Sequence, residues 1–266
     1  MDFLDGIATV FMPYSGFIYV AVAIFARMSL FIFLLPGIGE QSIPVRIRLT
    51  IAMGLTLLIL PILLQPGMAR PQTISTAAAL IGKESIFGLF LGLSFRLMVF
   101  GLQIVGNIVA QSLSLSQVLG EGIATEPNTT ISTILMLSGV TLLVTLNLHT
   151  EAFYLFVQSY EAFPLGAIID FDEIAYSLSR QAMDIFHICF SLSFPFLLLN
   201  FAYNLLLGFL NKAMPQLLVS FVGMPAITGI GILLVALCGD IVMGLWLEQY
   251  QGLTRDLFSN FGRTAP

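Results

Sequence analysis

The sequence predicts an all-α, polytopic membrane-type protein, and three observations support this fold class. Hydrophobic residues make up 58% of the chain and charged residues only 9%, whereas about 25% of a soluble domain is charged. The mean hydropathy is +0.97. Residues 185–211 and 213–239 contain no charged side chain, and uncharged apolar runs beyond about 18 residues are typical of membrane-spanning helices.

Six apolar segments follow one another, and a membrane-spanning helix requires about 20 apolar residues. They cover residues 17–38, 49–64, 78–110, 131–157, 185–210 and 214–247. Asn211, Lys212 and Ala213 alone join the last two segments, which predicts a tight helical hairpin. Residues 158–184 are rich in acidic side chains and are expected to form a loop, and the residues after Trp246 turn polar and are expected to form a short tail.

Charged and proline residues interrupt these segments. A charge at the centre of a bilayer costs about 2.5–3.5 kcal/mol on insertion scales, so either the charges pair within a bundle or part of the chain lies outside lipid. We expect buried charges at five positions, with at least one basic residue within ion-pair distance of an acidic group in this chain or a partner: Arg27, Lys83, Glu84, Arg96 and Asp240. Pro61 and Pro195 are expected to interrupt helical runs.

The charges between the segments predict a membrane orientation. Arg46 and Arg48 lie between the first two segments, and Lys212 lies between the last two. The positive-inside rule places these connections in the cytoplasm and both termini outside. Three basic residues outside these loops oppose that orientation: Arg70, Arg255 and Arg263.

Motifs of enzymes, metal sites and nucleotide sites are absent from the sequence. Gly82-Lys83 is followed by Glu84, so no phosphate-binding loop is present. The two histidines and the isolated carboxylates offer little for acid–base chemistry. The basic residues form no stripe of the kind that binds nucleic acid. We therefore expect no catalytic residue, metal, cofactor or nucleic-acid partner.

Two lines of polar residues run through the apolar segments. Gln103, Asn107 and Gln111 are spaced by four and share one helix face, and serines continue the polarity from Ser112. They could line or plug an aqueous conduit, but hydrogen bonding between helices is the favoured interpretation. The second line, which is open to the same two interpretations, consists of Asn200, Asn204, Gly208 and Asn211.

The order of motifs resembles the FliR family, called SctT in injectisomes. Residues 36–48 (PGIGEQSIPVRIR) resemble the family's loop after its first apolar segment, and Gly82-Lys83-Glu84 with Gly88 and Gly92 resembles a later family motif. Leu148-His149, Ser159-Tyr160 and Pro164-Leu165-Gly166 follow. The most specific match is residues 208–225, GFLNKAMPQLLVSFVGMP. The resemblance covers about residues 15–250.

The resemblance implies an architecture and partners. The chain would be a single FliR-like export-gate domain. Residues 1–184 would form a FliP-like part, residues 185–250 a FliQ-like helical hairpin, and residues 251–266 a polar tail. Partners would be FliP-like and FliQ-like subunits in a hetero-oligomeric ring, an FlhB-like subunit, exported unfolded proteins and membrane lipid.

The resemblance also assigns roles to residues. A constriction loop would follow the third apolar segment and include Gln111, Ser112, Ser114, Ser116, Gln117, Gly120 and Gly122. A subunit contact or turn motif would comprise Asn200, Asn204, Gly208, Asn211, Lys212, Pro215, Gln216, Gly223 and Pro225.

The function predicted in this way is that of a non-enzymatic subunit of the type III export gate in the bacterial inner membrane. It would help to form the closed pore through which unfolded flagellar subunits are exported. The alternative is the homologous injectisome subunit. A more remote alternative is a small-molecule secondary transporter, which should show repeated halves that this sequence lacks.

Overall fold

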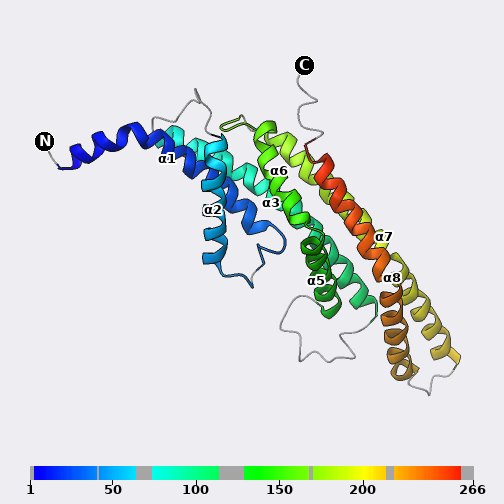
Figure 1. Ribbon diagram of the computed structural model, residues 1–266. Helices are drawn as coiled ribbons and strands as arrows, with labels where there is room; N and C mark the ends of the chain where they lie inside the picture. The colour runs from blue at the N-terminus through cyan, green and yellow to red at the C-terminus, as the bar shows by residue number, and fades with distance from the viewer. Residues whose placement is uncertain are drawn as a thin grey trace. The chain divides into compact units, whose positions relative to one another are not determined.

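The structure is a computed structural model that describes residues 3–40, 42–63, 74–113, 129–167, 170–213 and 219–258. Within these ranges the regular structure is entirely helical, which confirms the predicted all-α class (Figure 1). The helices are α1 (Phe3–Leu34), α2 (Val45–Leu63), α3 (Ile74–Ser112), α5 (Thr130–Thr145), α6 (Leu148–Ala162), α7 (Phe171–Ala213) and α8 (Val219–Asp256).

Five of these helices are long and apolar enough to cross a membrane, and the number rises to six if α5 and α6 together form one broken span. The break between α5 and α6 lies at Leu146 and Asn147. Asn147 has φ +56° in the left-handed region, which asparagine enters more readily than most residues because its short amide can bond locally. The number of apolar helices therefore agrees with the six predicted segments.

The acidic stretch 158–184 is mostly helical, so the loop predicted there is wrong. Helix α6 continues to Ala162 and α7 begins at Phe171. The Oδ1 atom of Asp170 accepts hydrogen bonds from the backbone N–H groups of Asp172 (3.0 Å) and Glu173 (3.2 Å). The acidic residues thus cap the positive end of a helix, where negative charge is stabilising.

Two further expectations about helix ends need correction. Pro61 and Pro195 lie inside continuous helices rather than interrupting them, as proline often does in membrane-type helices. Helix α8 extends beyond Trp246 to Asp256. Its last turns alternate buried Tyr250 with exposed Glu248 and Gln249, so the increase in polarity there marks an amphipathic helix.

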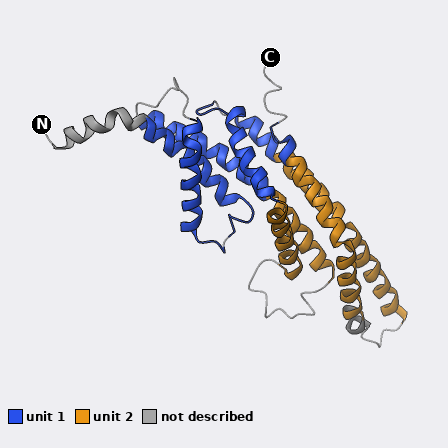
Figure 2. Ribbon diagram, in the orientation of Figure 1, with its two compact units in different colours: residues 1–96, 147–178, 254–266 blue, residues 97–146, 179–253 orange. Residues whose placement is uncertain are grey.

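The chain forms two compact units (Figure 2). Unit 1 contains residues 1–96, 147–178 and 254–266, and unit 2 contains residues 97–146 and 179–253. Unit 1 therefore holds α1, α2, α6 and the first part of α3, whereas unit 2 holds α5 and most of α7 and α8. The proposed boundary between FliP-like and FliQ-like parts at residue 184 stays a prediction.

The core of unit 1 is aromatic and closely packed. The ring of Phe31 on α1 contacts those of Phe95, Phe153 and Phe156 at centroid distances of 5.1–6.1 Å. Helices α1 and α3 meet at Gly88, where an added Cβ would lie 2.3 Å from the carbonyl oxygen of Arg27. The Gly88–Gly92 motif therefore permits a backbone contact between two helices.

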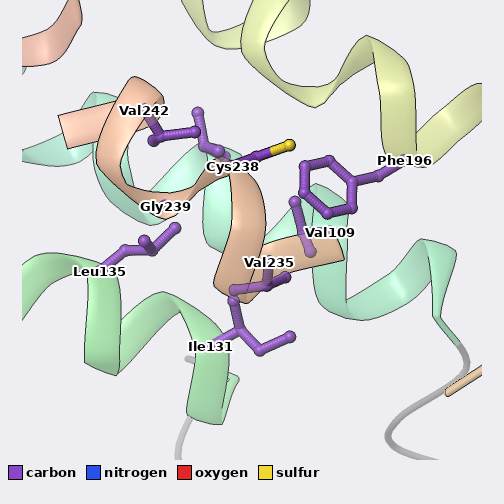
Figure 3. A pocket seen from close by; sticks show the side chains of 9 residues that line it. Val109, Ile131, Leu135, Phe196, Val235, Cys238, Gly239 and Val242 are labelled. Carbon is purple, nitrogen blue, oxygen red and sulfur yellow. The ribbon is translucent and has the colours of Figure 1, made fainter. Parts of the chain in front are cut away.

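The core of unit 2 joins α3, α5, α7 and α8. The indole Nε1 of Trp246 on α8 donates to the carbonyl oxygen of Met98 on α3 at 2.8 Å. Phe196 of α7 and Val235 of α8 face a small apolar cavity that α3 and α5 also line (Figure 3). The cavity volume of about 10 Å³ leaves room for no more than about one water molecule, so the four helices pack closely at this point.

Candidate functional site

A buried arginine lies at the centre of the polar contacts in unit 1. The guanidinium of Arg27 donates to Glu84 Oε2 at 3.2 Å, and the exposed fractions of both side chains are 0%. It also donates to Ser159 Oγ at 2.7 Å and to the carbonyl oxygens of Ser159 and Phe163. Tyr160 and Phe87 place their rings against it, at 4.0 and 5.1 Å from the guanidinium carbon. Arg27 is thus paired and enclosed by α1, α3 and α6.

Three charged residues converge on the short connection after α6. Arg27 donates to the carbonyl of Phe163, and Lys83 Nζ donates to the carbonyl of Gly166 at 3.2 Å. The other oxygen of Glu84 accepts the backbone N–H of Gly166, also at 3.2 Å. Non-helical backbone inside a membrane protein must have its polar groups satisfied by protein or by water. The charges therefore supply the hydrogen bonds that this connection lacks internally.

A second ion pair in unit 1 joins α3 to the turn after α1. Arg96 contacts Glu40 through two hydrogen bonds of 2.6 and 3.4 Å. The exposed fractions of the two side chains are 16% and 15%. Glu40 belongs to the motif at residues 36–40 in the sequence, but nothing in the local pattern indicates that its partner is Arg96, far along the chain. Two of the expected basic residues thus lie within ion-pair distance of an acidic group.

The five charges differ in burial within this chain, and for those that are not fully buried here the expectation of burial stays a prediction. Only Arg27 and Glu84 are fully buried. Lys83 and Arg96 are half-buried, and Asp240 is exposed on α8 with no partner among the described residues. Asp240 lies on the outer side of its helix, since Val242 and Trp246 make the contacts with the core.

The motif residues quoted from separate parts of the sequence meet in this network. Lys83 and Glu84 come from one motif, and Ser159, Tyr160 and Gly166 come from another. Sequence reasoning did not connect them, because 57 residues separate Arg27 from Glu84 and 132 separate Arg27 from Ser159.

Two residues of the first polar line, Gln103 and Asn107, form hydrogen bonds between helices of unit 2. Gln103 Nε2 donates to the sulfur of Met136 at 2.8 Å. The Oδ1 atom of Asn107 accepts from the backbone N–H of Thr129 at 3.3 Å and from its hydroxyl at 3.1 Å. Gln111 is exposed. The first two residues thus join α3 to α5, as the favoured interpretation predicted, and both also line a groove of about 340 Å³ between α3 and α7.

Of the residues predicted for the constriction loop, only the first two, Gln111 and Ser112, are described, and both belong to the last turn of α3 rather than to a loop. Ser112 donates to the carbonyl of Ile108, and Leu113 follows as the last described residue of this stretch. The hydroxyl of Thr228 on α8 donates to the Leu113 carbonyl at 3.0 Å. The next described residue, Thr129, lies beyond the predicted loop and caps α5. The remaining predicted residues lie outside the described ranges: Ser114, Ser116, Gln117, Gly120 and Gly122.

The second polar line lies on the exposed side of α7. Asn204 donates to the carbonyl and the side-chain oxygen of Asn200, both at 2.8 Å. Asn211 and Lys212 are exposed, and Gly208 has open space around it. Within the described residues, Asn200 and Asn204 therefore bond each other along α7 and not another helix.

The turn motif is described only in part. Pro215 and Gln216 lie outside the described ranges. Gly223 lies against the ring of Tyr203, where an added Cβ would be 3.1 Å from two ring carbons. Pro225 is exposed inside α8. Gly223 therefore allows α7 and α8 to approach each other near the turn.

Comparison with known proteins assigns the family. Residues 18–253 match the family model "Bacterial export proteins, family 1". The chain belongs to this family. Three relatives are each named "Flagellar biosynthetic protein FliR". The protein from Caulobacter vibrioides is 28% identical over 91% of this chain and 96% of its own length. Those from Escherichia coli K12 and Bacillus subtilis 168 are 27% and 23% identical over 76% and 82% of this chain, and over 77% and 85% of their own lengths.

The family membership agrees with the membrane-type helices. The match also covers far more of the chain than any single motif. The matched range begins in α1 and ends in α8, so it includes the network around Arg27 and both ends of the predicted constriction loop. The chain is therefore a membrane-type member of the FliR family.

Proposed function

We propose that this chain is a non-enzymatic subunit of the flagellar type III export gate in the bacterial inner membrane. The observation that carries the proposal is the match of the chain, over nearly its whole length, to a family of bacterial export proteins and to relatives named as flagellar biosynthetic proteins. That name also favours the flagellar over the injectisome alternative. Its helices, apolar along most of their length, suit a membrane complex.

Its partners in this proposal are FliP-like, FliQ-like and FlhB-like subunits, and its cargo is unfolded flagellar protein. Exposed apolar residues on α7 and α8 support assembly, because much of the apolar surface of these helices remains uncovered within the chain. The proposed FliQ-like hairpin at residues 185–250 contains most of that surface.

The proposed constriction is the stretch 111–122, which begins at the last two residues of α3 and continues into the connection to α5. Contacts of the described residues on either side support the proposal, since Thr228 donates to the Leu113 carbonyl and Asn107 accepts from Thr129. A closed pore in a membrane must limit ion flow as well as cargo. The connection is therefore proposed to seal the assembled complex until cargo passes.

The test deletes the gene for this chain in its motile host and, in a second strain, replaces it with a tagged copy. Loss of the chain should abolish motility and the secretion of flagellar subunits, and the tagged chain should copurify with FliP and FliQ homologues. Deleting residues 112–118 should make the assembled complex leak small ions, measured as membrane conductance. Secretion that continues without the chain would reject the export role. Unchanged conductance in an assembled deletion complex would reject the constriction.

A further inference from the structure

Asp240 is the exposed charge in the apolar part of α8. It follows Leu237 by three residues and precedes Gly244 by four, so these residues share one helix face. Leu237 is 68% exposed and Ile241, the next residue after Asp240, is 60% exposed. An added Cβ at Gly244 would meet no atom within 4 Å. A carboxylate therefore lies within an open, apolar helix face that no described part of unit 2 covers.

Asp240 is remote from the polar end of its helix. Glu248 lies two turns further on the same face, at a rise of about 12 Å, where Glu248 and Gln249 are both exposed. Between them α8 presents Ile241 and Leu245 to the outside. Asp240 therefore does not belong to the polar end, and an unpaired charge among apolar side chains is costly in either lipid or a protein interior.

Unit 2 supplies no cation that can reach Asp240. Phe196 of α7 and Cys238 of α8 line the same cavity (Figure 3), so they lie at one level of the hairpin. Measured along α7 from that level, Arg180 is roughly 20 Å and Lys212 roughly 27 Å away from the level of Asp240. An arginine or lysine side chain spans about a quarter to a third of those distances. These two are the lysine and arginine side chains among the described residues of unit 2, and His187 of α7 also lies out of reach, roughly 10 Å along the helix from the level of Asp240.

The neighbouring helix α7 also exposes an apolar face, and this face is longer than the hydrocarbon layer of a bilayer is thick. The exposed apolar residues of α7 recur every three or four positions on one side, and they are Met183, Phe186, Phe190, Phe194, Leu198, Phe201, Leu205 and Phe209. From first to last they extend about 39 Å along the helix, which exceeds the hydrocarbon thickness of about 30 Å. Tilt shortens that length across a bilayer but supplies no counter-charge for Asp240.

We propose that Asp240 forms an ion pair with a lysine or arginine on a helix of another subunit, which packs on the face of α8 formed by Leu233, Leu237, Asp240 and Gly244. The inference rests on the proposed function, because it requires a multisubunit assembly. The open space at Gly244 admits a neighbouring helix closely, which removes water from the pair. Removing one partner of such a pair should strongly weaken the association of the two subunits, because the other charge stays buried without a counter-charge.

The experiment uses the full export complex purified from membranes through a tag on this chain. Asp240→Lys should lower recovery of the neighbouring subunit by about tenfold and Asp240→Asn by a smaller factor, whereas Asp240→Glu should retain most of it. Glu248→Gln on the same face is the matched control and should leave recovery unchanged. A photo-reactive residue at Leu237 should cross-link to a partner helix, and mutating its basic residue to Asp should restore recovery with Asp240→Lys.

Several outcomes would overturn the inference. Wild-type recovery with both Asp240→Lys and Asp240→Asn would do so, as would cross-links from position 237 only to lipid or only to this chain. Asp240→Asn adds no new charge, so the test remains decisive if Asp240→Lys fails to insert. If the wild-type chain recovers no partner subunits, the proposed function fails. If it does and the Asp240 variants do too, only this inference fails.

Discussion

The two compact units differ in whether the charges within their apolar helices are paired inside the chain. Unit 1 pairs its interior charges within the chain, since Arg27 contacts Glu84, Ser159 and Phe163 while Arg96 contacts Glu40. Unit 2 has a packed apolar core but presents Asp240 on α8, and Asn204 and Lys212 on α7, to the outside. The comparison indicates that unit 1 satisfies its buried charges within the chain, whereas unit 2 leaves Asp240 unpaired among the described residues.

The largest expected effect is on the ion pair of unit 1. Glu84→Gln should lower the free energy of unfolding by about 3–5 kcal/mol, because it leaves the buried Arg27 charge without its counter-charge. Arg27→Met with Glu84→Met should cost less than either single change, since no unpaired charge remains. SDS titration of the purified chain measures both. A Glu84→Gln variant as stable as wild type would remove the ion pair as a determinant of unit 1.

A matched control for this prediction lies on the exposed hairpin. Asp240→Asn removes a carboxylate from unit 2 in the same way, but Asp240 has no partner among the described residues. The isolated chain should therefore keep its stability. If Asp240→Asn destabilises the isolated chain as much as Glu84→Gln does, the distinction between the two units is wrong.

The next expected effect compares two glycines. An added Cβ at Gly88 would lie 2.3 Å from the carbonyl oxygen of Arg27, whereas one at Gly208 would meet no atom within 4 Å. Gly88→Ala should therefore destabilise the chain by about 1–3 kcal/mol through overpacking of α1 against α3. Gly208→Ala should leave the unfolding of the isolated chain nearly unchanged. Equal losses of stability would show that α7 is already covered within the chain.

The same glycine pair also separates folding from assembly. Gly208→Leu places a bulky side chain on the exposed line of α7, so it should lower copurification of partner subunits while the chain still inserts at normal levels. Gly88→Leu should lower insertion itself. Normal partner recovery with Gly208→Leu would leave that line of α7 facing lipid.

Sequence patterns identified the helices more completely than their contacts. Apolar runs alone gave the all-α class and six apolar segments, because lipid-facing and buried apolar residues produce the same signal. The cost of an uncompensated charge correctly singled out Arg27 for burial. It could not separate Arg27 from Asp240, since both interrupt apolar runs and their different exposure depends on which helix face meets the core.

Local sequence patterns could not predict the contacts, because the contacts join residues far apart in the chain. Ser159 and Gly166 were recognised only as parts of a family motif, and their bonds to Arg27 and Glu84 arise from the packing of α6 against α1 and α3. The stretch 158–184 was misjudged for a local reason, because acidic residues that begin a helix look like a loop when only charge is considered. Thr228 carried no sequence signal, as one threonine among many in apolar helices.

The smallest expected effect concerns the link between α3 and α5 in unit 2. Asn107→Ala removes the acceptor for the backbone N–H and hydroxyl of Thr129, which is the N-cap of α5. Hydrogen bonds between membrane helices contribute about 0.6 kcal/mol on average, so the chain should lose about 0.5–1.5 kcal/mol. Thr129→Val removes the hydroxyl that also caps Ser132. In a double-mutant cycle the two changes should therefore be non-additive.

In the assembled complex, Asn107→Ala should raise ion conductance less than deletion of residues 112–118 does, because the Thr228 hydroxyl still donates to the Leu113 carbonyl. Additive losses of stability, with unchanged conductance, would reduce Asn107 to a surface amide with no part in fixing this end of the connection.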